Sequence, residues 1–343
     1  MIIRPTSKDS NEPAPAVSIV IAAYNASSYI RETLDSVKAQ TFIDYEVIVV
    51  NDGSSDSEEL ERILESHPLP IVYISQQNKG VSAARNAAIN VARGEFYAQL
   101  DADDQWEPDY LAVQLRFLAD HPDTALVYPN AIIFGDSSET GLEYMKICPS
   151  EGQVSFESLI QERCIVLTCV TARTNVIRSV GMFDEGLRSC EDFDLWLRIV
   201  KNGDRISYHR QVLARYRRHK GSLSSDRVWM TSNLLAVMEK TAKRTDLTDS
   251  EREVLDKQLN FRRTTLRLFQ GKHALGLGDA TVALNRFEEA NQSLRSLKLS
   301  VAIFLLRYWP KVPIWAFAAR ERFLARRQTH LLAGIDTPRG IPS

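Results

Sequence analysis

The sequence predicts an α/β domain with a mostly parallel sheet, followed by an all-α region. Over the first hundred residues, short apolar runs alternate with helical patterns. Polar or acidic residues follow the ends of several of these runs, and strand signals disappear after about residue 225. Alternation of this kind is typical of βαβ units, which place their strands side by side in one parallel sheet.

The first half of the chain carries four predicted strands, at residues 17–23, 45–50, 71–74 and 96–100. Apolar runs of this length fit strands that are covered on both faces. Helices are expected over 27–40 and 80–93, with Ser27 or Ser28 as the cap of the first. A further helix should begin near Asp56, which has a glutamate three residues later, as in a capping box.

The predicted secondary structure changes twice in the later part of the chain. Residues 125–222 mix short strands with helices, and the clearest helix, 191–203, should bury Leu195, Trp196 and Ile199. Long helical patterns then follow at 228–245, 249–272, 279–293 and 297–328. We therefore predict a flexible arm over 1–16, an α/β domain over 17–225 and a helical domain over 226–343.

Small residues within the helical region resemble one tetratricopeptide-type helix pair. They include Gly271, Gly278, Ala283 and Ala290. A single pair cannot bury its own apolar face, so a solenoid is not expected. Close helix packing is favoured over a peptide-binding groove.

The composition excludes several classes of protein. The 343 residues include 42 Lys+Arg and 44 Asp+Glu, and a net charge of −2 argues against a nucleic-acid partner. The four cysteines show no C-x-x-C spacing, so reduced buried thiols are expected rather than a zinc site. The polar N-terminus and the lack of any long apolar run predict neither a secretion signal nor a membrane span, and hence a cytoplasmic location.

The last helical stretch is strongly basic. Residues 295–330 contain eight Lys or Arg and one Glu, interleaved with Phe and Trp. This combination suits the interface of an anionic membrane, and predicts a peripheral protein on the inner face of the cell membrane. The alternative is an ordinary packed helix pair with a solvated basic face.

Candidate ligand-binding residues follow the predicted strands at Tyr24-Asn25, Asp52 and Asp101/Asp103. In an open parallel sheet, ligands bind beyond the carboxyl ends of the strands. Three aspartates within 101–104 would repel one another, which favours a divalent cation over a simple turn and helix cap. Instead of binding a ligand, Asp52 could simply form an Asp-Gly turn with the next residue.

Two further clusters have both a chemical and a structural interpretation. Asp192 could act as a general base, or it could form a capping box with Ser189. The basic run 215–220 could attract a diphosphate, with His219 as a metal ligand, or it could be a solvated surface stripe.

Six motifs follow one another along the chain. They are VSIVIAAYN (17–25), NDGSSD (51–56), NKGVSAARN (78–86), QLDADD (99–104), EDFDLWL (191–197) and YRRHKGSLS (216–224). In this order they resemble the motifs of the family 2 inverting glycosyltransferases. Each motif is weak alone, but the ordered set is specific and covers about 17–225. The resemblance implies the glycosyltransferase A fold. Ala22 and Asn51 depart from the proline and aspartate that are common in the family.

The resemblance also implies roles for individual residues. Tyr24 and Asp52 would hold the nucleobase of a nucleotide-sugar donor, with Asn25 and Arg85 beside the nucleotide and Asp101 on its ribose side. Asp103 would bind a divalent cation, Mn²⁺ or Mg²⁺, and His219 would complete that site. Asp192 would be the catalytic base.

The activity implied is inverting transfer of a sugar from a nucleoside-diphosphate sugar, most commonly UDP-linked, to a hydroxyl of a glycan or lipid-linked glycan in surface polysaccharide biosynthesis. A nicotinamide-dependent dehydrogenase is rejected, because no G-x-G-x-x-G follows the first predicted strand. A nucleotidyltransferase is disfavoured by the absence of a glycine-rich loop there. A degenerate sugar-binding or membrane-assembly scaffold remains the alternative, although Asp101, Asp103 and Asp192 are all present.

Overall fold

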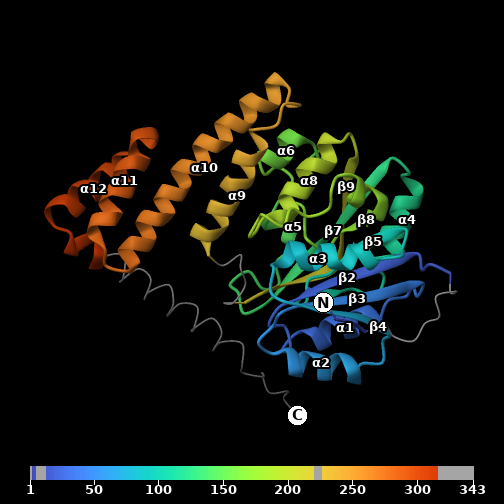
Figure 1. The fold of residues 1–343 in the computed structure, drawn as a ribbon. Coiled ribbons are helices and arrows are strands. Elements are labelled where there is room, and N and C mark those ends of the chain that lie inside the picture. The colour runs from blue at the N-terminus through green and yellow to red at the C-terminus, as the bar shows by residue number, and fades with distance from the viewer. Residues whose placement is uncertain (1, 5–12, 220–225, 316–343) are drawn as a thin grey trace, which may run out of the picture. The chain divides into compact units, whose positions relative to one another are not determined.

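The computed structural model describes residues 2–4, 13–219 and 226–315 (Figure 1). The chain divides into two compact units. Unit 1 comprises residues 1–225 and 236–256, and unit 2 comprises residues 226–235 and 257–343.

Within the described residues, unit 1 contains a nine-stranded sheet in the order β1-β4-β3-β2-β5-β8-β7-β9-β6. Its centre, β4-β3-β2-β5, is parallel, as predicted. Antiparallel pairs extend it on both sides, and β7 and β9 form a further parallel pair. The strands are β1 Ile2–Arg4, β2 Val17–Ala23, β3 Tyr45–Asp52, β4 Ile71–Gln76, β5 Phe96–Gln99, β6 Gln105–Trp106, β7 Thr124–Gly135, β8 Thr171–Arg173 and β9 Arg205–Arg218.

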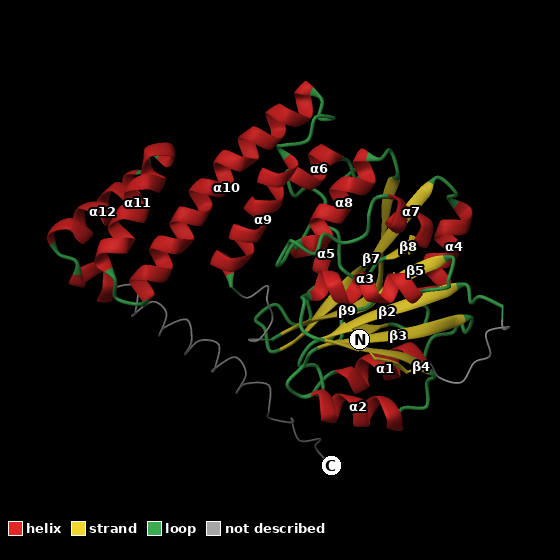
Figure 2. Ribbon diagram, in the orientation of Figure 1, coloured by secondary structure: helices red, strands yellow, loops and turns green. Residues whose placement is uncertain are grey.

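Helices cover both faces of the parallel strands. In Figure 2, α1 and α2 lie on one side of β2–β4 and α3 lies on the other. The apolar runs are therefore buried on both faces, and Ile19, Ile48 and Leu34 are inaccessible to solvent. The helices that lie wholly in unit 1 are α1 Ile30–Lys38, α2 Ser57–Ser66, α3 Val81–Val91, α4 Tyr110–Asp120, α5 Tyr144–Ile147, α6 Phe156–Ile160, α7 Thr174–Ser179 and α8 Glu191–Lys201.

The predicted helix caps are replaced by a contact between two loops. Tyr29 is the N-cap of α1, and its side chain makes no capping hydrogen bond. Asp56 precedes α2 without capping it. Its Oδ2 accepts instead from the backbone N–H of Ser27, 2.9 Å away. The predicted caps were wrong because the Ser27 N–H and Asp56 Oδ2 pair with each other across two loops instead of capping their helices.

The N-terminal stretch expected to be an arm contains one strand. β1 pairs antiparallel with the edge strand β4. Residues 5–12 of the predicted arm lie outside the described residues. All four cysteines are free thiols, and Cys164, Cys169 and Cys190 are buried, in agreement with the sequence.

Unit 2 has a core of its own. α9 Arg227–Thr241 and α10 Asp249–Gly276 contribute residues to both units, whereas α11 Ala280–Leu294 and α12 Leu297–Tyr308 lie within unit 2. Ala274, Ala283, Phe287 and Leu306 are buried together. A Cβ added to Gly271 would come within 2.4 Å of the Phe287 ring, so close packing is confirmed at this residue, whereas Gly278 has open space around it and a φ of +79°.

The final predicted helix is interrupted. α12 ends at Tyr308 and residues 311–315 are helical again, whereas the sequence predicted one helix over 297–328. Pro310 explains the break, because a residue that precedes proline is pushed out of the helical conformation, and Trp309 has φ −139° and ψ 63°. Residues 316–328 of that prediction lie outside the described residues. Among the helices that the structure describes, none combines the length and apolarity needed to cross a bilayer.

Candidate functional site

The sheet brings the predicted ligand-binding residues to one edge. β3, β2 and β5 are adjacent and parallel, so their carboxyl ends lie together. Tyr24 and Asn25 follow β2, Asp52 ends β3, and Asp101 and Asp103 follow β5. Since this edge is where open α/β sheets bind ligands, the structure supports one composite site there.

Arg85 of α3 connects two of the predicted motifs. Its Nη2 lies 2.8 Å from Asp101 Oδ1, and its Nη1 lies 2.5 Å from Glu191 Oε1. The Arg85 side chain is only 5% exposed. Burial disfavours its charge, but the carboxylates of Asp101 and Glu191 raise the pKa of Arg85. The guanidinium therefore stays charged and holds the start of α8 against the loop after β5.

Asp192 lies in the first turn of α8, next to this ion pair. Cys190, the residue before α8, has φ 59°, a left-handed conformation that turns the chain sharply into the helix. Asp192 Oδ1 accepts from the N–H of Phe193 at 2.7 Å, and the side chain of the N-cap residue, Cys190, makes no capping hydrogen bond. The capping-box interpretation is therefore wrong, because the helix begins at a left-handed turn rather than at a capping serine.

The environment of Asp192 suits a general base. Burial and the adjacent Glu191 carboxylate raise the pKa of Asp192 to about 7, although Arg85 opposes the shift. A carboxylate with a pKa near neutral pH is a better proton acceptor than an ordinary surface aspartate.

Asp103 and His219 meet although 116 positions separate them in the chain. His219 Nε2 lies 3.2 Å from Asp103 Oδ2, and the two side chains are 23% and 31% exposed. Burial and the charge of Asp101 raise the pKa of Asp103. His219 is the residue directly after β9. The position of this strand in the sheet therefore places the imidazole beside Asp103, the predicted metal ligand.

These two side chains fit a divalent cation as part of its ligand set. Octahedral Mg²⁺ with bonds of about 2.1 Å places neighbouring ligand atoms about 3 Å apart, close to the separation of Asp103 Oδ2 and His219 Nε2. No group of three or more His, Cys, Asp or Glu side chains within the described ranges could hold a metal alone. The remaining ligands would have to be phosphate oxygens and water, as is common for Mg²⁺.

Asp104 and Arg217 fix this loop, a role that was not predicted for either residue. Asp104 is 1% exposed, and its Oδ1 accepts from the backbone N–H of Arg217 at 2.7 Å. Arg217 Nε donates to the carbonyl of Asp103, also at 2.7 Å. Burial and the neighbouring Asp103 and Asp101 raise the pKa of Asp104 well above its usual range. Arg217, which is part of the basic run, thus stabilises the loop rather than binding a ligand. In the sequence, the only sign of this role is that Arg217 lies two residues before His219.

Asp52 holds a neighbouring loop. The side chain is buried, and Oδ1 accepts from Gln76 Nε2 at 2.8 Å and from the N–H of Lys79 at 2.9 Å. Oδ2 accepts from the N–H of Gly80 at 2.8 Å. Gly53, with φ +69°, lets this loop approach, because a Cβ there would come within 2.6 Å of the Asn78 nitrogen. The nucleobase contact of Asp52 stays a prediction beside this structural role.

The two residues after β2 differ in how freely their side chains could contact a ligand. Tyr24 is 56% exposed, so its ring is open to a stacking partner. Asn25 has φ 52°, and its Oδ1 accepts from both the N–H and the Oγ of Ser55 at 2.9 Å. Tyr24 is therefore the freer of the two to contact a ligand.

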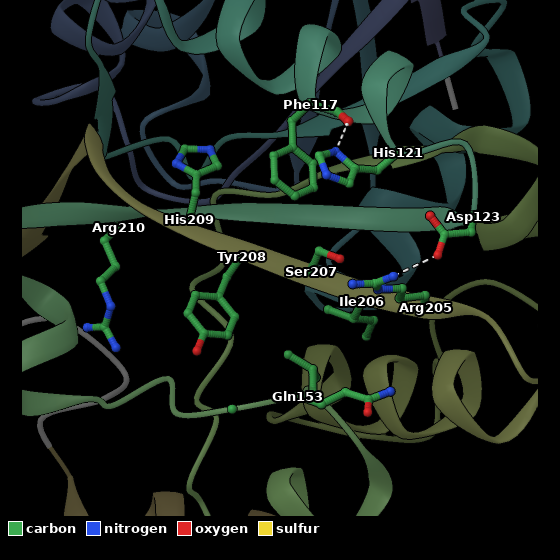
Figure 3. A pocket seen from close by; sticks show the side chains of 12 residues that line it. Phe117, His121, Asp123, Gln153, Arg205, Ile206, Ser207, Tyr208, His209 and Arg210 are labelled. Carbon is green, nitrogen blue, oxygen red and sulfur yellow. Dashed lines mark hydrogen bonds and ion pairs between the residues drawn. The ribbon is translucent and has the colours of Figure 1, made fainter.

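A cleft lies at the other end of β9, away from His219 (Figure 3). It has a volume of about 830 Å³, and its walls include Phe117, Tyr208 and His209. Arg205 and Asp123 form an ion pair of 2.7 Å at its margin. None of the predicted site residues lines this cleft, so it is separate from the composite site.

Comparison with known proteins identifies relatives of the α/β region. Residues 18–183 match the family described as glycosyl transferase family 2. An uncharacterized glycosyltransferase of Rickettsia felis is 32% identical over 222 residues, which are 62% of this chain. The chain spans 36% of that relative's length.

Two solved structures share the fold at low sequence identity. Residues 1–349 of S. aureus TarS, in complex with UDP-GlcNAc, match with a TM-score of 0.61 and 19% identity over 91% of this chain and 92% of that one. The mannosyltransferase PcManGT of Pyrobaculum calidifontis, in complex with GDP-Man and Mn²⁺, matches with a TM-score of 0.58 and 19% identity over 90% and 87%. These matches confirm the predicted α/β fold class with its helical C-terminal region.

Proposed function

Because residues 18–183 belong to glycosyltransferase family 2, we propose that this protein transfers a sugar from a nucleoside-diphosphate sugar to a hydroxyl group of a glycan or lipid-linked glycan, with inversion at the anomeric carbon. One observation carries the proposal. Arg85 contacts Asp101, which follows β5, and Glu191, which adjoins Asp192. Donor binding and proton removal would then occur at one edge of the sheet.

We propose that the donor binds with a divalent cation, Mn²⁺ or Mg²⁺, held by Asp103 and His219. Such a cation would offset the negative charge that develops on the leaving nucleoside diphosphate. Tyr24 would stack on the nucleobase, and Asp101 would face the ribose. The 3.2 Å separation of Asp103 and His219 supports this assignment.

Asp192 would remove the proton from the acceptor hydroxyl. The acceptor oxygen then forms a bond to the anomeric carbon while the bond from that carbon to the diphosphate breaks. Because the two events occur on opposite faces of the sugar, one displacement inverts the configuration. Arg85 keeps Glu191, and with it the first turn of α8, in place during this step.

The donor proposed is a UDP-sugar. TarS was solved with UDP-GlcNAc and PcManGT with GDP-Man, so GDP-sugars are the natural comparison. The proposed role is in surface polysaccharide biosynthesis at the inner face of the cell membrane. The basic, aromatic-rich segment 295–330 supports that location.

A donor screen tests the assignment. The protein is titrated with UDP-, GDP- and dTDP-sugars by calorimetry, with and without Mn²⁺. We expect one class to bind only with Mn²⁺, and Asp103→Asn to weaken that binding at least tenfold because a charged cation ligand is lost. Asp123→Asn, at the separate cleft, is the matched control and should bind as the parent does. Failure of every donor to bind the folded protein would favour the scaffold alternative.

Asp192→Asn separates proton removal from binding. General-base assistance typically contributes about 10²–10⁴-fold to the rate. Turnover should fall by that factor, while calorimetry finds donor affinity within about threefold of the parent, because the amide keeps the shape of the side chain but cannot accept the proton. Near-normal turnover would show that another group is the base.

A further inference from the structure

Helix α12 is apolar on two opposite faces. Leu299, Ile303 and Leu306 pack into the core of unit 2. On the other face, Leu297, Val301, Phe304 and Tyr308 are 81%, 52%, 52% and 60% exposed. At roughly 100° per residue these four lie on one narrow strip, the outer stripe, which is opposite the buried one. A helix that only covered its own core would carry polar side chains there.

Apolar surface continues beyond the end of the helix. Trp309, Val312 and Trp315 are 56%, 49% and 68% exposed. The rings of Phe304 and Tyr308 lie 4.8 Å apart, and those of Phe304 and Trp309 lie 5.9 Å apart. The outer stripe is therefore part of a contiguous aromatic surface, and surfaces of this kind mark interaction sites.

The charges around this surface indicate its partner. Lys298 and Arg307 lie at roughly right angles to the stripe, one on each side, and Lys311 is exposed beyond it. Arg307 is paired with Glu288. Long basic side chains beside Trp and Tyr are typical of helices in the headgroup region of a membrane, where the rings enter the lipid and the cations remain at the phosphates.

The same charges disfavour a second copy of the chain as the partner. A two-fold symmetric contact would place this basic face against itself. Lys298 and Lys311 flank this face and would meet like charges across such a contact. An anionic surface would instead attract these basic side chains.

We propose that the outer stripe of α12 inserts into the headgroup region of an anionic lipid bilayer and holds the protein at the membrane surface. The inference rests on the proposed function, since a lipid-linked acceptor would be found at that surface. It concerns lipid contact alone, so it can be tested without any sugar donor.

The test uses the full chain and vesicle sedimentation. Vesicles of phosphatidylcholine with roughly 30 mol % phosphatidylglycerol are compared with phosphatidylcholine alone. The parent should partition onto the anionic vesicles. Val301→Ser combined with Phe304→Ser should weaken partitioning at least tenfold, because two of the four apolar side chains of the stripe are lost. Lys298→Gln and Lys311→Gln should each weaken it about fivefold.

Leu277→Ser is the matched control, because Leu277 is an apolar residue of unit 2 that is 74% exposed and lies outside the stripe. It should partition as the parent does. The stripe inference is overturned if the parent ignores anionic vesicles, if the stripe variant binds like the parent, or if the stripe variant only dissociates a dimer in light scattering. Donor binding by calorimetry reports separately on the proposed function.

Discussion

At the scale of single residues, the site depends on one buried arginine. Arg85 pairs with both Asp101 and Glu191 and offsets part of their negative charge, and Asp192 lies next to this group. Without the guanidinium, three carboxylates would share a poorly solvated space, and their mutual repulsion would favour protonation. Arg85 thus keeps the catalytic carboxylate available as a base near neutral pH.

The pH dependence of catalysis follows from Asp192. Its pKa is about 7, and only the ionised form can accept a proton. The value of kcat/KM should therefore fall about tenfold for each pH unit below 7 and level off above it. The measurement is kcat/KM between pH 5 and 9 at saturating metal.

As the control, donor affinity is measured over the same pH range. Any change in kcat/KM that follows from weaker metal or donor binding can then be subtracted from the profile. If the acidic limb of the corrected profile lies near pH 4, Asp192 has the pKa of an exposed aspartate, and the role given to its burial is incorrect.

At the scale of elements, unit 2 depends on the contact between α10 and α11. Gly271 lies against the Phe287 ring, which is only 4% exposed. A glycine inside a helix costs about 1 kcal/mol relative to alanine. A glycine is present at position 271 because the Phe287 ring occupies the space that a Cβ would need.

Gly271→Ala should therefore destabilise the protein, although the substitution favours most helices. Crowding of a packed core costs about 1–3 kcal/mol, which exceeds the gain in helix propensity. The midpoint of urea unfolding, followed by circular dichroism, measures the effect. Gly276→Ala, at an exposed position at the end of α10, is the control and should be neutral or slightly stabilising. Equal midpoints for the two variants would contradict the packing argument.

At the scale of the whole molecule, unit 1 includes residues beyond 225. Lys240 Nζ lies 2.6 Å from both Asp184 Oδ2 and Asp194 Oδ1. Lys201 Nζ lies 2.8 Å from Glu251 Oε2, and these two side chains are each 11% exposed. Residues 236–256 thus neutralise charges that the α/β region has partly buried.

A chain that ends at residue 256 should be more stable than one that ends at residue 225. Loss of Glu251 removes the carboxylate partner of the partly buried Lys201, and loss of Lys240 leaves Asp194 with Arg198 alone, which together cost on the order of 3 kcal/mol. Urea unfolding of the two truncated chains, monitored by tryptophan fluorescence, gives the difference. Identical midpoints would place the boundary near 225, as the sequence predicted.

Much of the architecture and part of the site could be predicted from the sequence. The four parallel strands, the helices between them and the acidic residues at the strand ends follow from local periodicity, which does not depend on distant contacts. The ordered motifs indicated the family for the same reason, because each is a short local pattern. Asp103 and His219 were assigned to one site by the resemblance, and the fold brings them together.

The tertiary structure alone decided what several of these residues do. Arg85 meets a carboxylate 106 positions away, Asp52 closes on the loop at 76–80, and Arg217 fixes the loop after β5. No local pattern contains such contacts, because they depend on how strands and helices from distant parts of the chain are placed against one another. Whether a charged side chain binds a ligand or a neighbouring loop is decided by the groups that the fold brings within hydrogen-bonding distance.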